Sequence, residues 1–495
     1  MRFDFSFNSP DRSRRRPPAA VRRILLLGDL RGNGAAPDVS PHDRPILKVD
    51  FDTLDATLTR LAPVVQLGDA AGGERIEVRR LDDFHPDTLV QQLTTFQRLR
   101  NLRSRLENPR TFADAAAELQ RDAVAPATTI STPDVPSPGR DADTFDRLLG
   151  RTGPSSGADR SSSAPWPRAA ASALDALINR AIADHIVPAP DPRLSQLRGA
   201  VDAAMTDVMR AVLHDPAFQA VEAAWRTLQW LVSTLELGES LELYVLSATS
   251  DELTLAASRD GELWRRLVDG DWRAGGPKAL STLVALSRFD ATEADVSRLE
   301  QLGSLAGALE APLLAEASPT LLGVSSLAAH ADPRDWTAPP PADAERWRTF
   351  TSQDAARHVG LALPRFLLRL PYGQRTDPIA AFDFTEQPPR PAHDTLLWGN
   401  PAAAYAVALV RAIDPEGDAT TAGSLDGLPG FVFDAGDGPT LLPPTEVALT
   451  ERAVEAIQSR GLLPLIGYRD RVDARMLDPY PVTAGAGAGG REGPG

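Results

Sequence analysis

The run Arg23-Ile-Leu-Leu-Leu-Gly28 decides how the first part of this chain folds. Four consecutive apolar residues that end at a glycine are typical of a strand buried on both faces. Two more strands are predicted nearby, at Pro45–Phe51 and at Arg75–Arg80, where Ile76 and Val78 alternate with charged residues. Short strands followed by a helix indicate a small α/β unit.

An amphipathic helix is predicted after these strands. Pro86 suits the first position of a helix, and Asp87 favours the positive end of the helix dipole. Apolar residues then advance by three and four positions, so that one face of the helix packs and the other is solvated. They are Leu89, Leu93, Phe96, Leu99, Leu102 and Leu106. The first three, Leu89, Leu93 and Phe96, are candidate interaction residues.

A second helix is predicted to begin at Pro216, because Asp215 before it is a good N-cap. Its apolar residues are Phe218, Val221, Trp225, Leu228, Val232 and Leu235. Their spacing of about 3.5 residues is typical of a helix that presents a long seam to a partner. Four of them, Phe218, Trp225, Leu228 and Val232, are therefore candidate interaction residues.

The elements further along the chain indicate a parallel sheet. A strand at Leu280–Leu286, a helix opened by Thr292 and Asp295, and a strand at Ala311–Leu314 predict a βαβ unit. The fold class expected for the chain is therefore α/β (α+β).

Composition divides the chain into five parts. They are a flexible basic arm (1–21), a small α/β domain (22–123), a Pro/Ser/Gly-rich linker (124–168), a larger α/β domain (169–482) and a Gly/Ala tail (483–495). The linker and the tail hold too little apolar surface to offset the entropy of ordering them, so both are predicted to be disordered.

Charge and composition exclude several classes of protein. The 495 residues carry a net charge of −15, which argues against a general nucleic-acid binder. The absence of cysteine excludes disulfides, thiolate zinc sites and iron–sulfur clusters. Apolar runs such as Ile24–Leu27 are far shorter than the roughly 20 residues that span a membrane, so a cytoplasmic protein is expected.

The glycine-rich loop Gly28–Gly34 invites three enzyme interpretations, and each fails. The loop lacks the Gly-Lys-Ser/Thr ending of a phosphate loop, and its glycines have the wrong spacing for a dinucleotide fingerprint. It is similar to the Gly-Asp-Ser-Leu block of some esterases, but Leu30 replaces the nucleophile. We expect a strand end and a surface turn.

Other residue types give no sign of catalysis either. The seven histidines are scattered without the spacing of metal ligands. The chain's lysines are Lys48 and Lys278, and neither lies in a motif that would support a catalytic role. The sequence therefore predicts no catalytic residue, no cofactor and no metal site.

An ordered series of blocks resembles the sheath proteins of the type VI secretion system. Arg23–Asp29, Lys48-Val-Asp50 and Leu81–Asp87 resemble the small sheath subunit (TssB/VipA-like). The helix Leu213–Arg226 resembles the signature helix of the large subunit (TssC/VipB-like). The similarity continues through later blocks, which are Ser318–Gly323, Leu363–Gly373, Thr376–Ile379, Phe382–Phe384, Leu397–Asn400 and Pro444–Val447.

This resemblance implies a non-enzymatic component of a contractile sheath that assembles around an inner tube in the bacterial cytoplasm. It implies that the two subunits are fused and build one core jointly. The implied partners are copies of the chain or other sheath subunits, the inner-tube protein and the baseplate, without nucleic acid or membrane. Fusion replaces a bimolecular association by a tethered one and fixes the stoichiometry at one to one.

Two departures from the family pattern leave alternatives open. The family's large subunit continues beyond the block that corresponds to Leu462–Tyr468, and we expect this chain to lack that extension. Because strands of the extension pair with neighbouring protomers, a sheath-derived cap or adaptor that does not polymerise is an alternative. A third interpretation is an esterase-like enzyme at Gly28–Gly34.

The second departure concerns the segment that binds the family's AAA+ unfoldase. Only the amphipathic stretch Ala173–Val187 corresponds to it, with Leu174, Ile178 and Ile182 as candidate contacts. The alternative for this stretch is a helix packed on its own domain.

Overall fold

The computed structural model describes residues 21–35, 43–124, 193–388, 390–412, 423–434, 436 and 438–477. They fall in two compact units, one within Met1–Arg98 and Asp202–Gly495, the other within Leu99–Val201. The predictions for residues 1–20, the linker 125–168 and the tail lie outside the described residues. The same holds for the helix 173–187 with Leu174, Ile178 and Ile182.

A mixed sheet of nine strands forms the centre of the first unit. Across the sheet they are β11 (Ser424–Leu425), β15 (Ala474–Met476), β14 (Leu463–Gly467), β8 (Val359–Leu363), β7 (Leu313–Ala317), β6 (Thr282–Phe289), β1 (Arg22–Gly28), β5 (Leu241–Ser247) and β2 (Leu47–Val49). β1 pairs in parallel with β5 on one side and with β6 on the other. The N-terminal segment therefore supplies an inner strand to a sheet built mainly by the C-terminal segment.

The buried strand predicted from the opening sequence is confirmed. The side chains of Ile24, Leu25, Leu26 and Leu27 are all 0% exposed. Side chains alternate along a strand, so two of them face each side of the sheet. Each fully buried leucine or isoleucine contributes about 1.5–3 kcal/mol of hydrophobic stabilisation. Strand β1 is therefore a central part of the hydrophobic core that the N-terminal and C-terminal segments form together.

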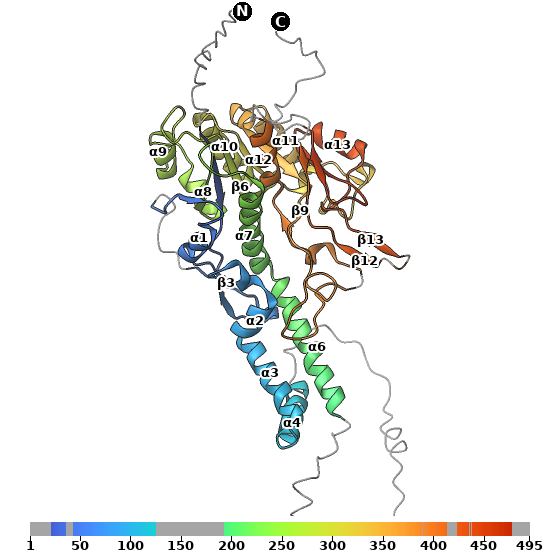
Figure 1. Ribbon diagram of the computed structural model, residues 1–495. Coiled ribbons are helices and arrows are strands. Elements are labelled where there is room, and N and C mark those ends of the chain that lie inside the picture. The colour runs from blue at the N-terminus through green and yellow to red at the C-terminus, as the bar shows by residue number, and fades with distance from the viewer. Residues whose placement is uncertain are drawn as a thin grey trace, which may run out of the picture. The chain divides into compact units, whose positions relative to one another are not determined.

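Helices cover both faces of the sheet. They are α7 (Pro216–Thr234), α8 (Ser250–Ala256), α9 (Glu262–Val268), α10 (Glu293–Ala308), α11 (Pro341–Thr351), α12 (Pro401–Ala412) and α13 (Glu451–Gln458). Leu25 and Leu27 pack in one cluster with α10, whereas α12 packs against β6, β7, β8 and α7 on the other face. Figure 1 shows α7 beside the blue N-terminal elements near β3. The parallel β6–α10–β7 unit confirms the predicted βαβ unit.

Smaller elements surround the sheet. Three antiparallel pairs join β3 (Val64–Gln66) to β4 (Arg75–Glu77), β9 (Phe366–Leu367) to β10 (Trp398–Gly399), and β12 (Val432–Asp434) to β13 (Pro439–Leu441). A short helix, α1 (Leu54–Leu61), precedes β3. The predicted α/β (α+β) class and the jointly built core are both confirmed, while the domain boundaries at residues 123 and 169 stay a prediction. Among the described residues, no helix combines the length and apolarity that crossing a membrane requires.

The prediction of one continuous helix from Leu89 to Leu106 is wrong. The chain forms α2 (Pro86–Gln92) and α3 (Thr94–Glu107), and Leu93 between them is extended. The cause is Glu74, whose carboxylate accepts hydrogen bonds from the backbone N–H groups of Thr94 (2.7 Å) and Thr95 (2.9 Å). A carboxylate bound to the first N–H groups of a helix fixes a new start at that point.

The second unit is helical. It holds the later turns of α3, the helix α4 (Phe112–Val124) and the first turns of α6 (Leu194–Leu213). Leu102, Leu106 and Ala115 are buried in it. Arg105 forms an ion pair with Glu118 at 2.6 Å.

The start of α7 depends on Asp215, as predicted. Its Oδ1 accepts hydrogen bonds from the N–H groups of Ala217 (2.9 Å) and Phe218 (3.1 Å), and its Oδ2 accepts one from the N–H of Gly68 (2.9 Å). One carboxylate therefore caps α7 and holds a loop of the N-terminal segment.

We expect Asp215→Ala to lower the free energy of unfolding by about 2 kcal/mol, because it removes a cap and leaves the Gly68 N–H without its acceptor. Urea denaturation measures this loss. Asp215→Asn keeps a capping oxygen but not the second acceptor, so it should lose about half as much. Equal losses in the two variants would contradict this account.

Candidate functional site

The candidate site is the joint between the N-terminal and C-terminal segments, defined here as the contacts of residues 28–34 and 81–96 with α7 and with residues 366–388. At one end of the joint the rings of Phe84 and Phe218 meet edge to face, with centroids 5.7 Å apart. Further along α7, the indole Nε1–H of Trp225 donates a hydrogen bond of 2.9 Å to the carbonyl of Leu30. These two contacts link positions 134 and 195 residues apart in sequence.

The structure brings the seven described candidate residues into the interior of the chain. Leu89, Leu93, Phe96, Phe218, Trp225, Leu228 and Val232 are all buried, the most exposed of them by only 6%. The seam of α7 does face a partner within the same polypeptide: Phe218 and Trp225 contact the N-terminal segment, and α7 also packs against β10 and α12. A role for these residues in contacts between separate protomers stays a prediction.

The glycine-rich loop lies where open α/β sheets bind ligands, at the carboxyl end of an inner parallel strand. Asp29 closes the loop by accepting hydrogen bonds from the N–H groups of Arg31 (3.0 Å) and Gly32 (2.9 Å). A side chain at Gly32 would meet Val221 of α7 at 2.9 Å, and Leu30 is fully buried. The expected surface turn is therefore packed against α7, and α7 fills the space beside it.

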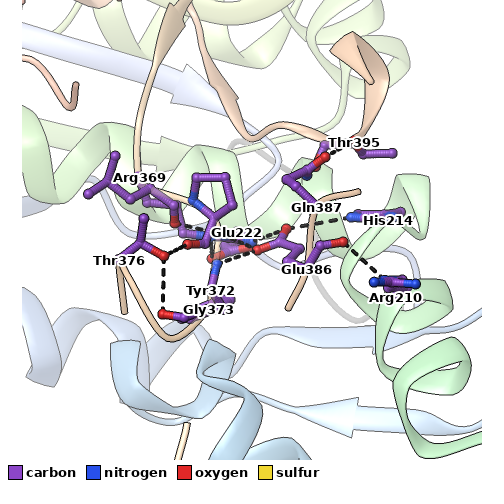
Figure 2. Close-up of polar contacts among 12 residues, drawn as sticks. Arg210, His214, Glu222, Arg369, Tyr372, Gly373, Thr376, Glu386, Gln387 and Thr395 are labelled. Carbon is purple, nitrogen blue, oxygen red and sulfur yellow. Dashed lines mark hydrogen bonds and ion pairs between the residues drawn. The ribbon is translucent and has the colours of Figure 1, made fainter. Parts of the chain in front are cut away.

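A buried ion network lies beside the joint, on its C-terminal side, where it links α7 to residues 366–388 (Figure 2). The guanidinium of Arg369 lies between two carboxylates, with Nε 2.9 Å from Glu222 Oε1 and Nη1 2.8 Å from Glu386 Oε2. The side chains of Glu222, Glu386 and Arg369 are 0%, 1% and 9% exposed. Charges buried this deeply persist only when each is paired and hydrogen-bonded, so the three residues act as one unit.

Neighbouring groups complete the network. Arg226 donates to Glu222 at 2.6 Å and to the hydroxyl of Tyr372 at 3.2 Å. His214 lies 3.5 Å from Glu386, and Arg210 donates to the carbonyls of Thr385 and Glu386. Hydrogen bonds and ion pairs from α6 and α7 thus hold residues 369–386 in place.

These contacts shift the pKa values of the buried groups. Burial raises the pKa of Glu386, but the charge of Arg369 and the hydrogen bonds from His214 and Arg369 outweigh it and lower the pKa to about 2. Burial lowers the pKa of Arg369, but its two carboxylates raise it well above its ordinary value. Burial raises the pKa of Tyr372 to about 12. The pair therefore stays ionised and the tyrosine neutral at physiological pH.

The same stretch also contacts the N-terminal segment. Asp87 accepts hydrogen bonds from the backbone N–H groups of Ala380 (2.9 Å) and Ala381 (2.8 Å). The ring of His85 meets Tyr372 edge to face at 5.0 Å. Residues 366–388 therefore bridge α7 and the residues that begin α2.

A second set of paired charges, of which the carboxylates of Glu316 and Glu446 are buried, lies at the carboxyl ends of β6, β7 and β8, around a polar pocket of about 180 Å³. Arg365 donates to Glu446 through Nε (2.9 Å) and Nη2 (2.6 Å), and Arg288 donates to Glu316 (2.5 Å). His393 Nε2 lies 2.9 Å from Glu446. Among the described residues, no group of acids and histidines has the arrangement of a metal site.

The two carboxylates of this pocket differ in pKa. Burial raises the pKa of Glu446, but the bonds from His393 and Arg365 lower it to about 2. Burial and repulsion by Glu446 raise the pKa of Glu316, and attraction by Arg288 and Arg365 does not offset them. Glu446 therefore remains ionised, because it accepts more hydrogen bonds than Glu316 does.

Acid is expected to destabilise the protein through Glu386 and Glu446. Both have a pKa near 2 in the folded chain against an ordinary value of 4.5, so their stabilisation is complete above pH 4.5 and is lost as the pH falls towards 2. Each carboxylate contributes on the order of 3 kcal/mol. Urea denaturation between pH 7 and 2.5 should show a shallower acid decline for Glu446→Gln than for the wild type. An unchanged decline would contradict the assignment.

Sequence reasoning missed the ion network, although one signal was present. Glu222 lies four residues after Phe218 and three before Trp225, on the apolar face of α7. A carboxylate in the middle of a buried face requires a buried cation, and Arg369 lies inside a block that resembles the sheath family. The pairing itself joins positions 147 residues apart, so spacing alone does not reveal it.

Both segments of the chain match known protein families. Residues 196–477 match the family described as EvpB/VC_A0108, tail sheath N-terminal domain (VipB), and residues 21–124 match the family described as Type VI secretion system, VipA, VC_A0107 or Hcp2. The chain is 31% identical over 291 residues to the type VI secretion system sheath protein TssC1 of Pseudomonas aeruginosa, which covers 55% of this chain and 58% of that protein. It is 28% identical over 96 residues to the sheath protein TssB1 of the same organism, which covers 18% of this chain and 56% of that protein.

The chain thus spans less than two thirds of the length of each of these relatives. The VipB match alone covers more than half of the chain. The chain therefore belongs to the type VI secretion sheath family, and it joins a VipA segment and a VipB segment in one polypeptide.

Proposed function

We propose that this chain is a structural component of the contractile sheath of a type VI secretion apparatus, and that it works in the bacterial cytoplasm around an inner tube. The observation that carries the proposal is the presence of both sheath segments in one chain, with β1 of the first paired between β5 and β6 of the second. Two segments that share a sheet move as one body, as a subunit that transmits force requires.

In this proposal the surface of the chain, and not a reaction centre, performs the function. A contact between unlike surfaces, repeated by a screw operation, builds a tube, so modest contacts sum to a cohesive lattice. The partners would be copies of the chain or other sheath subunits, the inner-tube protein and the baseplate. Fusion would keep the VipA and VipB segments at equal numbers in every ring.

The packing of the joint supports a non-enzymatic role. The carboxyl end of β1, where an α/β enzyme would hold its ligand, is packed by Trp225 and Val221. The charges around the polar pocket pair with one another, as Arg365 does with Glu446 and Arg288 with Glu316. In our proposal these apolar side chains and charge pairs stabilise the fold and do not take part in a reaction.

Electron microscopy of the purified full chain, alone and with its cognate inner-tube protein, tests the proposal. We expect tubes or stacked rings when the inner tube is present. Monodisperse small particles under every condition would reject self-assembly. Substoichiometric binding to the ends of a sheath made by other subunits would instead identify a cap or adaptor.

A further inference from the structure

An apolar pocket of about 310 Å³ opens between α11 and the end of α13. Its apolar lining comes from Ala291, Leu321, Pro339, Ala344 and Trp347. Trp347 is only partly buried. Apolar cavities of about 150 Å³ are large enough to hold a benzene molecule, so this pocket has room for an aromatic side chain.

The charges around the pocket leave one cation without a counterion. Two other charged residues of the lining, Asp343 and Arg348, are paired within α11. Arg460 donates to the carbonyl of Leu322 at 2.9 Å and lies over the ring of Trp336, but it forms no ion pair with a carboxylate of the described residues. Burial lowers the pKa of Arg460, and no acidic neighbour offsets this. A half-buried, unpaired guanidinium beside an apolar pocket favours a ligand that carries a carboxylate.

An exposed turn elsewhere in the chain has the complementary chemistry. Phe51, between β2 and α1, is 78% exposed, more than the exposed apolar side chains Val432, Val472 and Leu477, and it is aromatic. Asp52 beside it is exposed and forms no ion pair or side-chain hydrogen bond within the described residues. A ring next to an unpaired carboxylate therefore matches a pocket next to an unpaired guanidinium.

Phe51 and the pocket lie on opposite sides of one sheet. Phe51 follows β2, the last strand on one side, whereas Gly461 of the pocket lies two residues before β14. Five strands lie between β14 and β2, so at about 4.8 Å per strand the two features are about 30 Å apart. Figure 1 shows α1, next to Phe51, on the left and α13 on the right. A Phe51 ring that fills the pocket therefore belongs to another copy of the chain.

Both features also lie at the same end of the strands. β14 and β5 run in the same direction through the parallel pairs of the sheet, and β2 is antiparallel to β5. The end of β2 that leads to Phe51 therefore lies at the same edge as the start of β14. Copies placed side by side in one orientation present Phe51 of one to the pocket of the next. Such a contact between unlike surfaces repeats from copy to copy.

We propose that Phe51 of one copy inserts into the pocket between α11 and α13 of a second copy, with Asp52 paired to Arg460. The inference rests on the proposed sheath function and supplies one of the contacts between copies that this function needs. Burying the ring against Trp347 removes apolar surface from water, and the ion pair supplies the counterion that Arg460 lacks.

The absence of cysteine from the chain allows a direct test with two introduced thiols. Full chains with Ala56→Cys, on the exposed surface of α1, are mixed with full chains with Ser459→Cys, at the pocket. A bifunctional maleimide should join the thiols at positions 56 and 459 in a product of twice the chain mass, which mass spectrometry identifies. A monofunctional maleimide first shows that both thiols react. The lack of a product from two reactive thiols would overturn the proposal.

A matched pair of variants tests the role of the ring. Phe51→Ser in the first chain should lower the yield about tenfold or more, as the loss of a buried aromatic anchor does. Val432→Ser, at another exposed apolar side chain, is the control and should leave the yield unchanged. An unchanged yield with Phe51→Ser, equal losses in the two variants, or a product mainly between two thiols at position 56 would each overturn the proposal.

Exchanging the charges tests the ion pair across the contact. Asp52→Arg in one chain or Arg460→Glu in the other should each lower the yield about severalfold, and the two together should restore most of it. Restoration distinguishes a contact between chains from a change in the fold of either chain. A yield that stays low in the combination would overturn the pairing of Asp52 with Arg460.

This inference and the proposed sheath function fail in different ways. If the Phe51→Ser chain forms tubes or rings as well as the wild type does, the contact is overturned while the sheath function is supported. If the specific product forms but no tubes appear under any condition, the contact is supported while self-assembly into a sheath is rejected.

Discussion

Arg369→Ala is expected to lower the free energy of unfolding by about 3–5 kcal/mol. The substitution leaves the carboxylates of Glu222 and Glu386, which are 0% and 1% exposed, without the cation between them. It also removes the guanidinium from the face of Tyr372, where it lies 4.3 Å from the ring centroid. Urea denaturation at pH 7 measures the loss, and hydrogen exchange should show residues 369–386 opening first.

Arg348→Ala is the matched control for this variant. Arg348 also pairs with a glutamate, Glu345 on α11, but both side chains are well exposed, at 70% and 63%. Ion pairs at the surface contribute about 0–1 kcal/mol, so the control should remain close to the wild type. Similar losses in the two variants would show that burial does not set the strength of the network.

Trp225→Ala is expected to cost at least about 3–5 kcal/mol, the usual range for removing a fully buried aromatic side chain. Trp225 both fills the space at the carboxyl end of β1 and satisfies the carbonyl of Leu30. The loss should loosen the contact between the VipA and VipB segments. With a protease site placed in the linker, wild-type segments should co-purify after cleavage, and Trp225→Ala segments should separate at lower urea.

Trp225→Phe separates the two roles of this residue. Phenylalanine retains most of the volume but cannot donate to the Leu30 carbonyl, so we expect a loss of about 1–3 kcal/mol. A loss as large as that of Trp225→Ala would mean that the hydrogen bond, and not packing, holds the joint. No loss in either variant would contradict the role assigned to the joint.

Local signals predicted much of the fold. The apolar run of β1, the capping residues Asp215 and Thr292, and the parallel β6–α10–β7 unit follow from residues near one another in sequence, and the structure confirms each of them. The family resemblance supplied the joint core, since periodicity does not show which strands become neighbours.

The remaining errors have a common physical cause. Leu93 breaks the helix because Glu74, twenty residues before Thr94, caps a new start. The seam of α7 lies inside the chain because the glycine-rich loop at Leu30 and strand β3 pack against α7, and the pattern of a single helix does not reveal what covers it. In both cases a distant contact overrides a local pattern.

The position of β1 also bears on how the polypeptide acquires its structure during synthesis. Arg23 and its partner Glu242 are separated by 219 positions, so the strand leaves the ribosome long before its neighbours exist. At 5–20 residues per second this interval is about 10–40 s, during which an apolar segment has nothing to pair with. If the small subunit were translated separately, the time before β1 meets its partner strands would depend on diffusion and on the concentration of the large subunit. In the fused chain, that time is limited to the time needed to translate one polypeptide.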